Sequence, residues 1–327
     1  MRRRVVLSVL ALLSAALVGL YFWYVRGAGI GPQIVAGPGL LWEVKKPLPQ
    51  ARTEVTAAVW RGRIVVVGGF DGFARTTTTV QIYDPVRDAW ELGPPLPHSV
   101  HHAMAASVGD RLYLVGGLSG VRFHSTARVF VFDGAWREVA PLPEPLGASG
   151  IGVLDSRIHV ISGEGSAGNV AAHYIYNPAA DRWERRAEVP APRDHLAAVV
   201  LNGRLYAIGG RLEGGMSRNL TRVDVYDPRT DTWATAPPIQ TARSGHTAAV
   251  VDRRIFVFGG EQPGGTIAPV EAFDGTRWTT VSRMPTPRHG LGAAVLGQTM
   301  YLLAGGKRPG LSVSGSNEAL TVSPSAP

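Results

Sequence analysis

Apolar and polar positions alternate along the chain in a unit that recurs through most of its length. Each copy begins with an apolar run, a two-residue polar or glycine turn, and a second apolar run that ends at a pair of small residues. A third apolar run, an aspartate-containing turn and a tryptophan complete the unit. In the fourth copy these segments are residues 196–200, Asn202-Gly203, 204–208, Gly209-Gly210, 223–226, Asp227-Pro228 and Trp233. Apolar runs joined by two-residue polar turns are typical of β-hairpins, so each copy predicts four antiparallel strands.

Two independent markers give the number of copies. The tryptophans that end the unit stand at positions 42, 90, 136, 183, 233 and 278. The small pairs end at residues 69, 117, 163, 210, 260 and 305, with the same steps of 48, 46, 47, 50 and 45 residues. A repeat of roughly 50 residues with four strands indicates a β-propeller. We therefore predict an all-β fold with six blades.

The two ends of the repeat region predict how the ring closes. Trp42 has the signature of a fourth strand, but no first three strands precede it. The last copy has three candidate strands and no tryptophan after them. Residues 40–44 are therefore expected to pair with residues 318–322 and to complete the sixth blade, which removes an open sheet edge. The propeller is predicted to occupy residues 40–323, followed by a tail of residues 324–327.

These motifs resemble those of a known family. The Gly-Gly pairs, the Tyr-Asp-Pro turn and the tryptophan seven residues after Tyr83, Tyr176 and Tyr226 are similar to Kelch repeats. The resemblance covers residues 41 to about 323. It implies a β-propeller, in agreement with the spacing, and it implies an interaction surface, because Kelch propellers in general bind other molecules.

The first 26 residues predict a membrane anchor. Arginines at positions 2–4 precede an uncharged run over residues 5–25, which is long enough to cross a bilayer as a helix and ends in aromatic residues. A single arginine follows the run, so we expect the N-terminus inside the cell and the propeller outside the cytoplasmic membrane. A cleaved signal peptide is the alternative. Residues 1–26 are assigned to the anchor and residues 27–39 to a linker.

Composition narrows the possible chemistry. The net charge is +8, but the repeats contain no run of lysine or arginine, so nucleic acid is not an expected partner. Cysteine is absent, which excludes disulfides, thiolate metal sites and the Cys–Tyr copper site found in galactose oxidase. The histidines come from different repeats without compact metal-ligand spacing. We therefore expect no metal and no other cofactor.

Candidate ligand-binding residues lie where the first strand of each blade begins. Four of the six equivalent positions there are arginine, and the small pairs that end the second strands are expected on the same face. This arrangement predicts a basic mouth of the central channel that binds an anionic ligand. The predicted binding residues are Arg52, His102, Arg193, His195, Arg211, Arg243, Glu261, Arg288 and His289. An internal ion-pair network is the alternative.

Two functions fit such a mouth. The first is a binding module for an anionic small molecule, such as a sugar acid, or for an acidic segment of a partner protein. The second is an enzyme, because residues 161–164 are similar to the segment that carries the candidate catalytic glutamate of bacterial six-bladed Kelch mutarotases acting on sialic acid. That resemblance implies Glu164 as a catalytic residue of a sugar-acid mutarotase or epimerase. Arg211 on the next blade and His195 are expected near it and would supply the electrophile and the acid/base partner that proton transfer needs. Val170 replaces the partner arginine of that family, which departs from its pattern.

Overall fold

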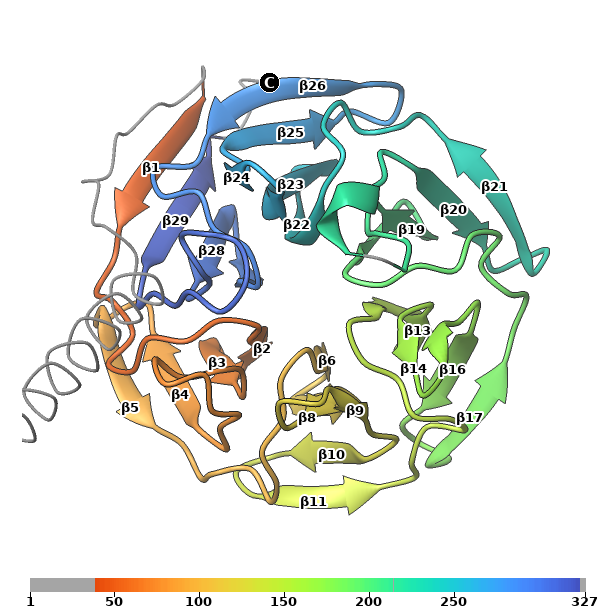
Figure 1. Ribbon diagram of the computed structural model, residues 1–327, viewed down its shortest axis with the longest axis horizontal. Coiled ribbons are helices and arrows are strands. Elements are labelled where there is room, and N and C mark those ends of the chain that lie inside the picture. The colour runs from red at the N-terminus through yellow and green to blue at the C-terminus, as the bar shows by residue number, and fades with distance from the viewer. Residues whose placement is uncertain (1–38, 214, 324–327) are drawn as a thin grey trace, which may run out of the picture.

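The computed structural model describes residues 39–213 and 215–323, and their strands form six antiparallel blades around a central axis (Figure 1). Helix in the described residues is limited to the 3₁₀ turn η1 (Met216–Arg218). None of these residues belongs to a helix long and apolar enough to span a membrane. The predicted anchor, the linker up to residue 38 and the C-terminal tail lie outside the described residues. The all-β propeller with six blades is thus confirmed.

The blades follow one another in chain order around the ring, each with its first strand innermost. Blade one consists of β2 (Thr56–Trp60), β3 (Arg63–Val67), β4 (Val80–Asp84) and β5 (Ala89–Leu92). Blade two consists of β6 (Met104–Val108), β7 (Arg111–Val115), β10 (Val129–Phe132) and β11 (Trp136–Val139). Blade three consists of β12 (Gly150–Leu154), β13 (Arg157–Ile161), β16 (His173–Asn177) and β17 (Arg182–Arg185).

The second half of the ring repeats this arrangement. Blade four consists of β18 (Ala197–Leu201), β19 (Arg204–Ile208), β20 (Val223–Asp227) and β21 (Thr232–Ala236). Blade five consists of β22 (Ser244–Val251), β23 (Arg254–Gln262), β25 (Pro269–Phe273) and β26 (Trp278–Arg283). Blade six consists of β27 (Gly292–Leu296), β28 (Thr299–Leu303), β29 (Asn317–Val322) and β1 (Leu40–Val44).

Blade six closes the ring with strands from both ends of the chain. β1 pairs antiparallel with β29, from Leu40 opposite Val322 to Val44 opposite Glu318. Trp42 is buried in this blade, and its indole N–H donates to the hydroxyl of Ser282 in blade five at 2.9 Å. The predicted closure is therefore confirmed, and it pairs the strand edges that the first three strands of the last repeat would leave open.

Tryptophans of the fourth strands fasten each blade to the one before it. The indole N–H of Trp90 donates to the carbonyl of Lys46 at 2.8 Å, and Tyr83 lies against the Trp90 ring. The Tyr83 hydroxyl donates to Asp88, which also accepts the backbone N–H of Lys46. The indole bond recurs from Trp136 to Pro94, Trp183 to Ala140, Trp233 to Ala187 and Trp278 to Pro237. The spacing of tryptophans in the sequence therefore reflects contacts between blades.

The small pairs bring the second strand of one blade against the start of the next. The backbone N–H of Gly260 donates to the carbonyl of Arg288 at 2.9 Å. Gly259 has a φ of +66°, and a Cβ there would lie 2.2 Å from the same carbonyl oxygen. Such a distance is far below any van der Waals contact, so glycine is required at this position.

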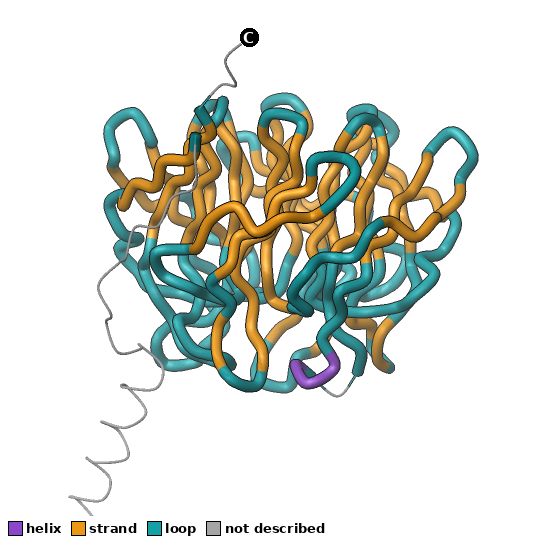
Figure 2. Tube along the Cα trace, turned by 90° about the horizontal axis from the view of Figure 1, so that it is seen from above, coloured by secondary structure: helices purple, strands orange, loops and turns teal. Residues whose placement is uncertain are grey.

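The two faces of the ring differ. Figure 2 shows tight turns at one face and longer loops, including η1, at the other. Small hairpins extend the long-loop face. They are β8 (Leu118–Ser119) with β9 (His124–Ser125), β14 (Glu164–Gly165) with β15 (Gly168–Asn169), and β24 (Gly265–Thr266) with the end of β23. The predicted site residues that follow the small pairs lie on this face.

Apolar clusters fill the spaces between neighbouring blades, as Val65 and Phe130 do between blades one and two.

Candidate functional site

A ring of backbone hydrogen bonds surrounds the channel on the long-loop face. It is formed by one residue per blade, just before the innermost strand, and each has a left-handed φ between 50° and 60°. In blades two to six, the N–H of this residue donates to the carbonyl of its counterpart in the preceding blade, over 2.8 to 3.1 Å. Val55 closes the circle by donating to the carbonyl of Gly290. The ring positions are Glu54, His102, Ala148, His195, Gly245 and Gly290.

The ring places Glu54 beside two histidines. Oε2 of Glu54 lies 3.1 Å from Nε2 of His102, and Oε1 lies 3.3 Å from Nε2 of His289. Burial opposes ionisation of Glu54, but the hydrogen bond and charge of His289 outweigh it and hold the pKa of the carboxyl well below its usual range. Burial likewise opposes protonation of His289, yet the hydrogen bond and charge of Glu54, with Glu261, raise the pKa of His289 to about 9. Glu54 and His289 therefore form a buried ion pair at neutral pH.

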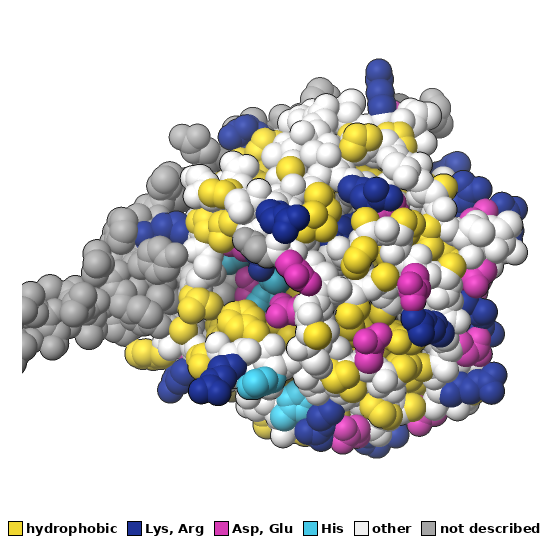
Figure 3. All heavy atoms as spheres, turned by 45° about the vertical axis from the view of Figure 1, so that its right-hand side comes forward, with side chains coloured by type: hydrophobic (Ala, Val, Ile, Leu, Met, Phe, Trp, Pro, Cys, Tyr) yellow, Lys and Arg dark blue, Asp and Glu magenta, His cyan; other side chains and the backbone are white. Residues whose placement is uncertain are grey.

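Arg211 is the centre of a second group on the same face. Its guanidinium donates to Asp194 and Glu261, each over 3.0 Å, and lies 3.0 Å from Nε2 of His195. Asp194 also binds Nδ1 of His195 at 2.5 Å. The side chain of Arg211 is 17% exposed, so the group is reachable from solvent. In Figure 3, histidine and acidic side chains share a hollow near the middle of this face.

Glu164 lies at the edge of this group on the β14–β15 hairpin. Its carboxyl is half-buried, and burial raises its pKa, with the neighbouring charge of Asp194 adding to the effect. His195 and Arg211 are close enough to oppose that shift. The three predicted catalytic residues, Glu164, Arg211 and His195, therefore lie in the same part of the mouth. A carboxyl of raised pKa is suited to proton transfer near neutral pH.

The four predicted arginines of the channel mouth lie elsewhere, which corrects that expectation. Arg52, Arg193, Arg243 and Arg288 are fully buried. Each guanidinium points into its own blade and donates to the carbonyl of the residue 16 positions later. Each also binds a polar side chain on the third strand. These partners are Gln81, Asp224, Glu271 and Glu318.

The four arginines point into the blades because the small pairs, which have positive φ, turn backbone carbonyls toward the blade interior. Those carbonyls and the third-strand acceptors need donors, because an unpaired buried polar group costs free energy. An arginine just before the first strand reaches them all. The arginines thus stabilise the blades, as the alternative of an internal ion-pair network implied, and they do not form a basic surface.

The mouth itself carries mixed charge. Carboxylates of Glu54, Asp194 and Glu261 lie there beside the cationic Arg211 and His289. Of the nine predicted binding residues, the fold brings His102, His195, Arg211, Glu261 and His289 together at this mouth. Glu54 and Asp194 were not among the predicted binding residues, although the position of Glu54, equivalent to those of His102 and His195, indicates that it faces the mouth.

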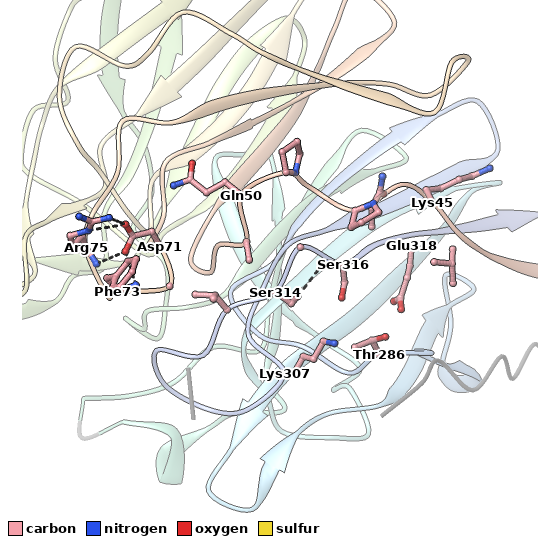
Figure 4. Close-up of a pocket in the computed structure, with 18 residues that line it drawn as sticks. Lys45, Gln50, Asp71, Phe73, Arg75, Thr286, Lys307, Ser314, Ser316 and Glu318 are labelled. Atoms are coloured by element: carbon pink, nitrogen blue, oxygen red, sulfur yellow. Dashed lines mark hydrogen bonds and ion pairs between the residues drawn. The ribbon is translucent and has the colours of Figure 1, made fainter. Parts of the chain in front are cut away.

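A second concave site lies on the seam between blades six and one, and we call it the seam pocket. It has a volume of about 670 Å³. Lys45, just after β1, and Lys307, in the loop after β28, both line it (Figure 4). These are two of only three lysines in the chain. Its other labelled lining residues are Gln50, Asp71, Phe73, Arg75, Thr286, Ser314, Ser316 and Glu318.

The carboxylates of the seam pocket are already paired. Asp71 binds Arg75 at 2.7 Å, and Glu318 binds the buried Arg288 at 2.6 Å. Lys45 contacts the exposed Glu43 at 3.3 Å. Because arginines offset Asp71 and Glu318, the pocket keeps a positive balance from Lys307 and from Lys45, which Glu43 offsets in part. Sequence reasoning missed it, because its walls come from segments far apart in the chain that meet only when the ring closes.

The family models that match this protein cover its repeat region. The sequence matches the "KLHDC2/KLHL20/DRC7 Kelch-repeats domain" over residues 93–260 and 150–314, and the "Kelch motif" over residues 51–97. The first of these covers more than half of the chain. The protein belongs to the Kelch-repeat family. Its blades are Kelch repeats in which the fourth strand of the last blade comes from the N-terminal side.

Curated relatives share part of this Kelch propeller. Kelch-like protein 35 of Mus musculus is 31% identical over 90 residues, which are 27% of this chain and 16% of the relative. A Kelch repeat-containing protein of Arabidopsis thaliana is 36% identical over 97 residues, which are 26% of this chain and 22% of the relative. The chain thus spans less than a quarter of the length of these relatives.

A solved structure shows the same fold over most of the chain. The structure of YjhT matches with a TM-score of 0.74 at 13% identity, and the match covers 84% of this chain and 96% of YjhT. At this identity the likeness concerns the Kelch propeller fold and not the chemistry of the site.

Proposed function

We propose that this Kelch propeller is an interaction module that binds an acidic segment of a partner protein in the seam pocket. The observation that carries the proposal is the position of Lys45 and Lys307 in one concave site. An anionic ligand was expected at the channel mouth, but the arginines behind that expectation are buried inside the blades. At the mouth, carboxylates offset the cationic Arg211 and His289, whereas the seam pocket supplies two lysines.

The size and lining of the pocket support a short peptide segment as the ligand. A volume of about 670 Å³ lies within the range of roughly 300 to 1,000 Å³ usual for ligand sites. Pro47, Pro49 and Phe73 offer apolar contacts beside the lysines. Charge complementarity of this kind contributes mainly to specificity and to the rate of association.

Charge reversal of the lysines tests the proposal. We expect Lys45→Glu and Lys307→Glu each to weaken binding of an aspartate- and glutamate-rich peptide at least about tenfold, since a rim charge becomes repulsive. Lys46→Glu is the matched control, because Lys46 is exposed and does not line the pocket. Titration of the labelled peptide by fluorescence anisotropy measures the affinity. Equal affinity in all three variants would exclude the seam pocket as the site.

The location of the module is the second part of the proposal. The apolar run over residues 5–25 supports a single-pass anchor with the propeller outside the cytoplasmic membrane. Protease added to cells with a permeable outer envelope should then digest the propeller. Protection of the whole chain would reverse the orientation. A soluble form that starts after about residue 25 would instead favour the cleaved signal peptide.

A mutarotase acting on a sugar acid is the second candidate function, and the surroundings of Glu164 favour it. Its half-buried carboxyl with a raised pKa lies near Arg211 and His195. Glu164→Gln keeps the shape and loses the titrating proton, so anomerisation of a sugar acid, followed by NMR, should fall at least about a hundredfold. Glu188→Gln, on the outer surface, is the control. Equal rates with Glu164→Gln and wild type would reject the enzymatic function.

A further inference from the structure

The hydrogen bonds around His102 leave two acceptors facing each other. Nε2 of His101 lies 3.1 Å from the carbonyl of Gly120, and a carbonyl only accepts, so this nitrogen carries a proton. With this proton on Nε2, Nδ1 of the His101 imidazole is the acceptor. Nδ1 of His102 lies 2.5 Å away and must donate to it. Nε2 of His102 is then an acceptor, 3.1 Å from the carboxylate oxygen Oε2 of Glu54.

The hydrogen bond to Asp194 determines the tautomer of His195. Its Nδ1 lies against the carboxylate of Asp194, which accepts, so the proton is on Nδ1 and the lone pair is on Nε2. One ligand atom each from Glu54, His102 and His195 lie within 4.8 Å of one another. All three residues are at most 9% exposed. Three lone pairs therefore converge in a buried position. Those on Oε2 of Glu54 and Nε2 of His102 repel each other unless a cation lies between them.

We propose that Glu54, His102 and His195 form a binding site for a divalent metal ion of the zinc type. Oε2 of Glu54 and Nε2 of each histidine are the ligands. The 3.1 Å between Glu54 and His102 is close to the edge of about 3.3 Å of a tetrahedron with zinc bonds of about 2.0 Å. Two imidazoles and a carboxylate leave a fourth position open, as in catalytic zinc sites.

Outer partners hold each ligand in the required state. His289 binds Oε1 of Glu54, His101 binds Nδ1 of His102, and Asp194 binds Nδ1 of His195. Such partners orient ligands and fix tautomers in metal sites. The histidines are scattered in the sequence, which is why spacing alone indicated no metal. The ring brings them together because they occupy equivalent positions in blades one, two and four.

Arg211 is the competitor of the metal ion. Its guanidinium lies 3.0 Å from Nε2 of His195, so it donates to the lone pair that the metal would use. On metal binding it would keep Asp194 and Glu261 as partners. Replacing Arg211 should therefore tighten metal binding, because it removes a neighbouring positive charge and frees Nε2 of His195 to bind the metal. A purely structural role of His195 would give no such effect.

The test is a zinc titration of the full chain without a histidine tag, after removal of bound metal with a chelator. We expect one zinc ion per chain, measured by metal analysis after dialysis. Co²⁺ should bind in its place and give the visible absorption of a four-coordinate ion. Glu54→Gln, His102→Asn and His195→Asn should each weaken zinc binding at least tenfold. Asparagine is chosen because it tolerates the left-handed φ of these ring positions.

Controls separate the site from surface binding. His124→Asn, at an exposed position of β9, should leave zinc affinity unchanged. Arg211→Gln should tighten it, and an unchanged affinity there would contradict the assignment of His195 as a ligand. Wild type that binds no zinc, or binds it equally well after both Glu54→Gln and His102→Asn, would overturn the site. Because the seam pocket lies apart from these residues, failure here leaves the peptide proposal intact.

Discussion

Single residues in this propeller have roles that their chemical type does not indicate. Arginine near a channel suggests ligand binding, yet Arg243 has no exposed surface. It donates to the carbonyls of Gly259 and Pro269 and to the carboxylate of Glu271, which is buried as well. The guanidinium thus satisfies acceptors from two strands of one blade. Its function is to keep those acceptors paired in the absence of water.

Removal of this arginine should therefore destabilise the fold. We expect Arg243→Ala to lower the free energy of unfolding by about 3 to 5 kcal/mol, because Glu271 is left as an unpaired buried charge. Urea unfolding measures the change. Arg229→Ala removes an ion pair with Asp227 in which the arginine side chain is 79% exposed, so it should have little effect. A similar small loss in both variants would return Arg243 to the list of candidate binding residues.

Individual blades differ in the side chains that they bury, although their strands repeat. β13 and β16 of blade three carry His159 and His173, which lie 3.0 Å apart and are almost fully buried. Burial lowers the pKa of His159 to about 3 and that of His173 to about 4. Blade five has the apolar residues Phe256 and Val270 at the equivalent positions. Blade three therefore contains groups that charge only when it unfolds.

Lowering the pH should destabilise this blade within a defined pH range. Below about pH 6.5 the unfolded chain binds protons that the folded chain does not, so stability falls as pH decreases towards about 4. Each histidine contributes up to about 1.4 kcal/mol per pH unit in that range. The double variant His159→Asn/His173→Asn should reduce the slope of unfolding free energy against pH, measured with urea between pH 7.5 and 4.5. An unchanged slope would contradict the assignment.

The whole molecule depends on closure of the ring. β1 contributes the buried Leu40 and Trp42 to blade six and pairs along all of its length with β29. Apolar contacts between blades continue around the ring, because β1 packs with residues of blade five as well. A missing fourth strand would expose the edge of β29 and open these contacts.

Truncation tests closure directly. A chain that starts at residue 45 should lose at least about 3 kcal/mol of stability relative to one that starts at residue 37, since two large side chains lose their burial. It should also aggregate through the exposed edge of β29. Thermal unfolding and light scattering of the two purified chains give the comparison. Equal stability would show that β1 is dispensable for the ring.

The sequence alone determined the number of blades, the strand order within each blade and the closing strand. These properties follow from local alternation, turn residues and spacing, because each blade is one repeat and contacts its neighbours at fixed positions. Trp90 and its equivalents keep their spacing since each indole bonds to the preceding blade. The seven-residue interval from Tyr83 to Trp90 likewise places the two rings against each other.

Only the tertiary structure decided where the polar side chains point. An arginine before the first strand can face the channel or the blade, and buried carbonyls 16 residues later settle this once strands two and three are paired. The polar cluster and the seam pocket are also tertiary. Glu54, His102 and His195 meet because the ring brings three blades to one axis, and Lys45 meets Lys307 because the ends of the propeller join. Those distances are set by the closed ring, and local sequence patterns carry no information about them.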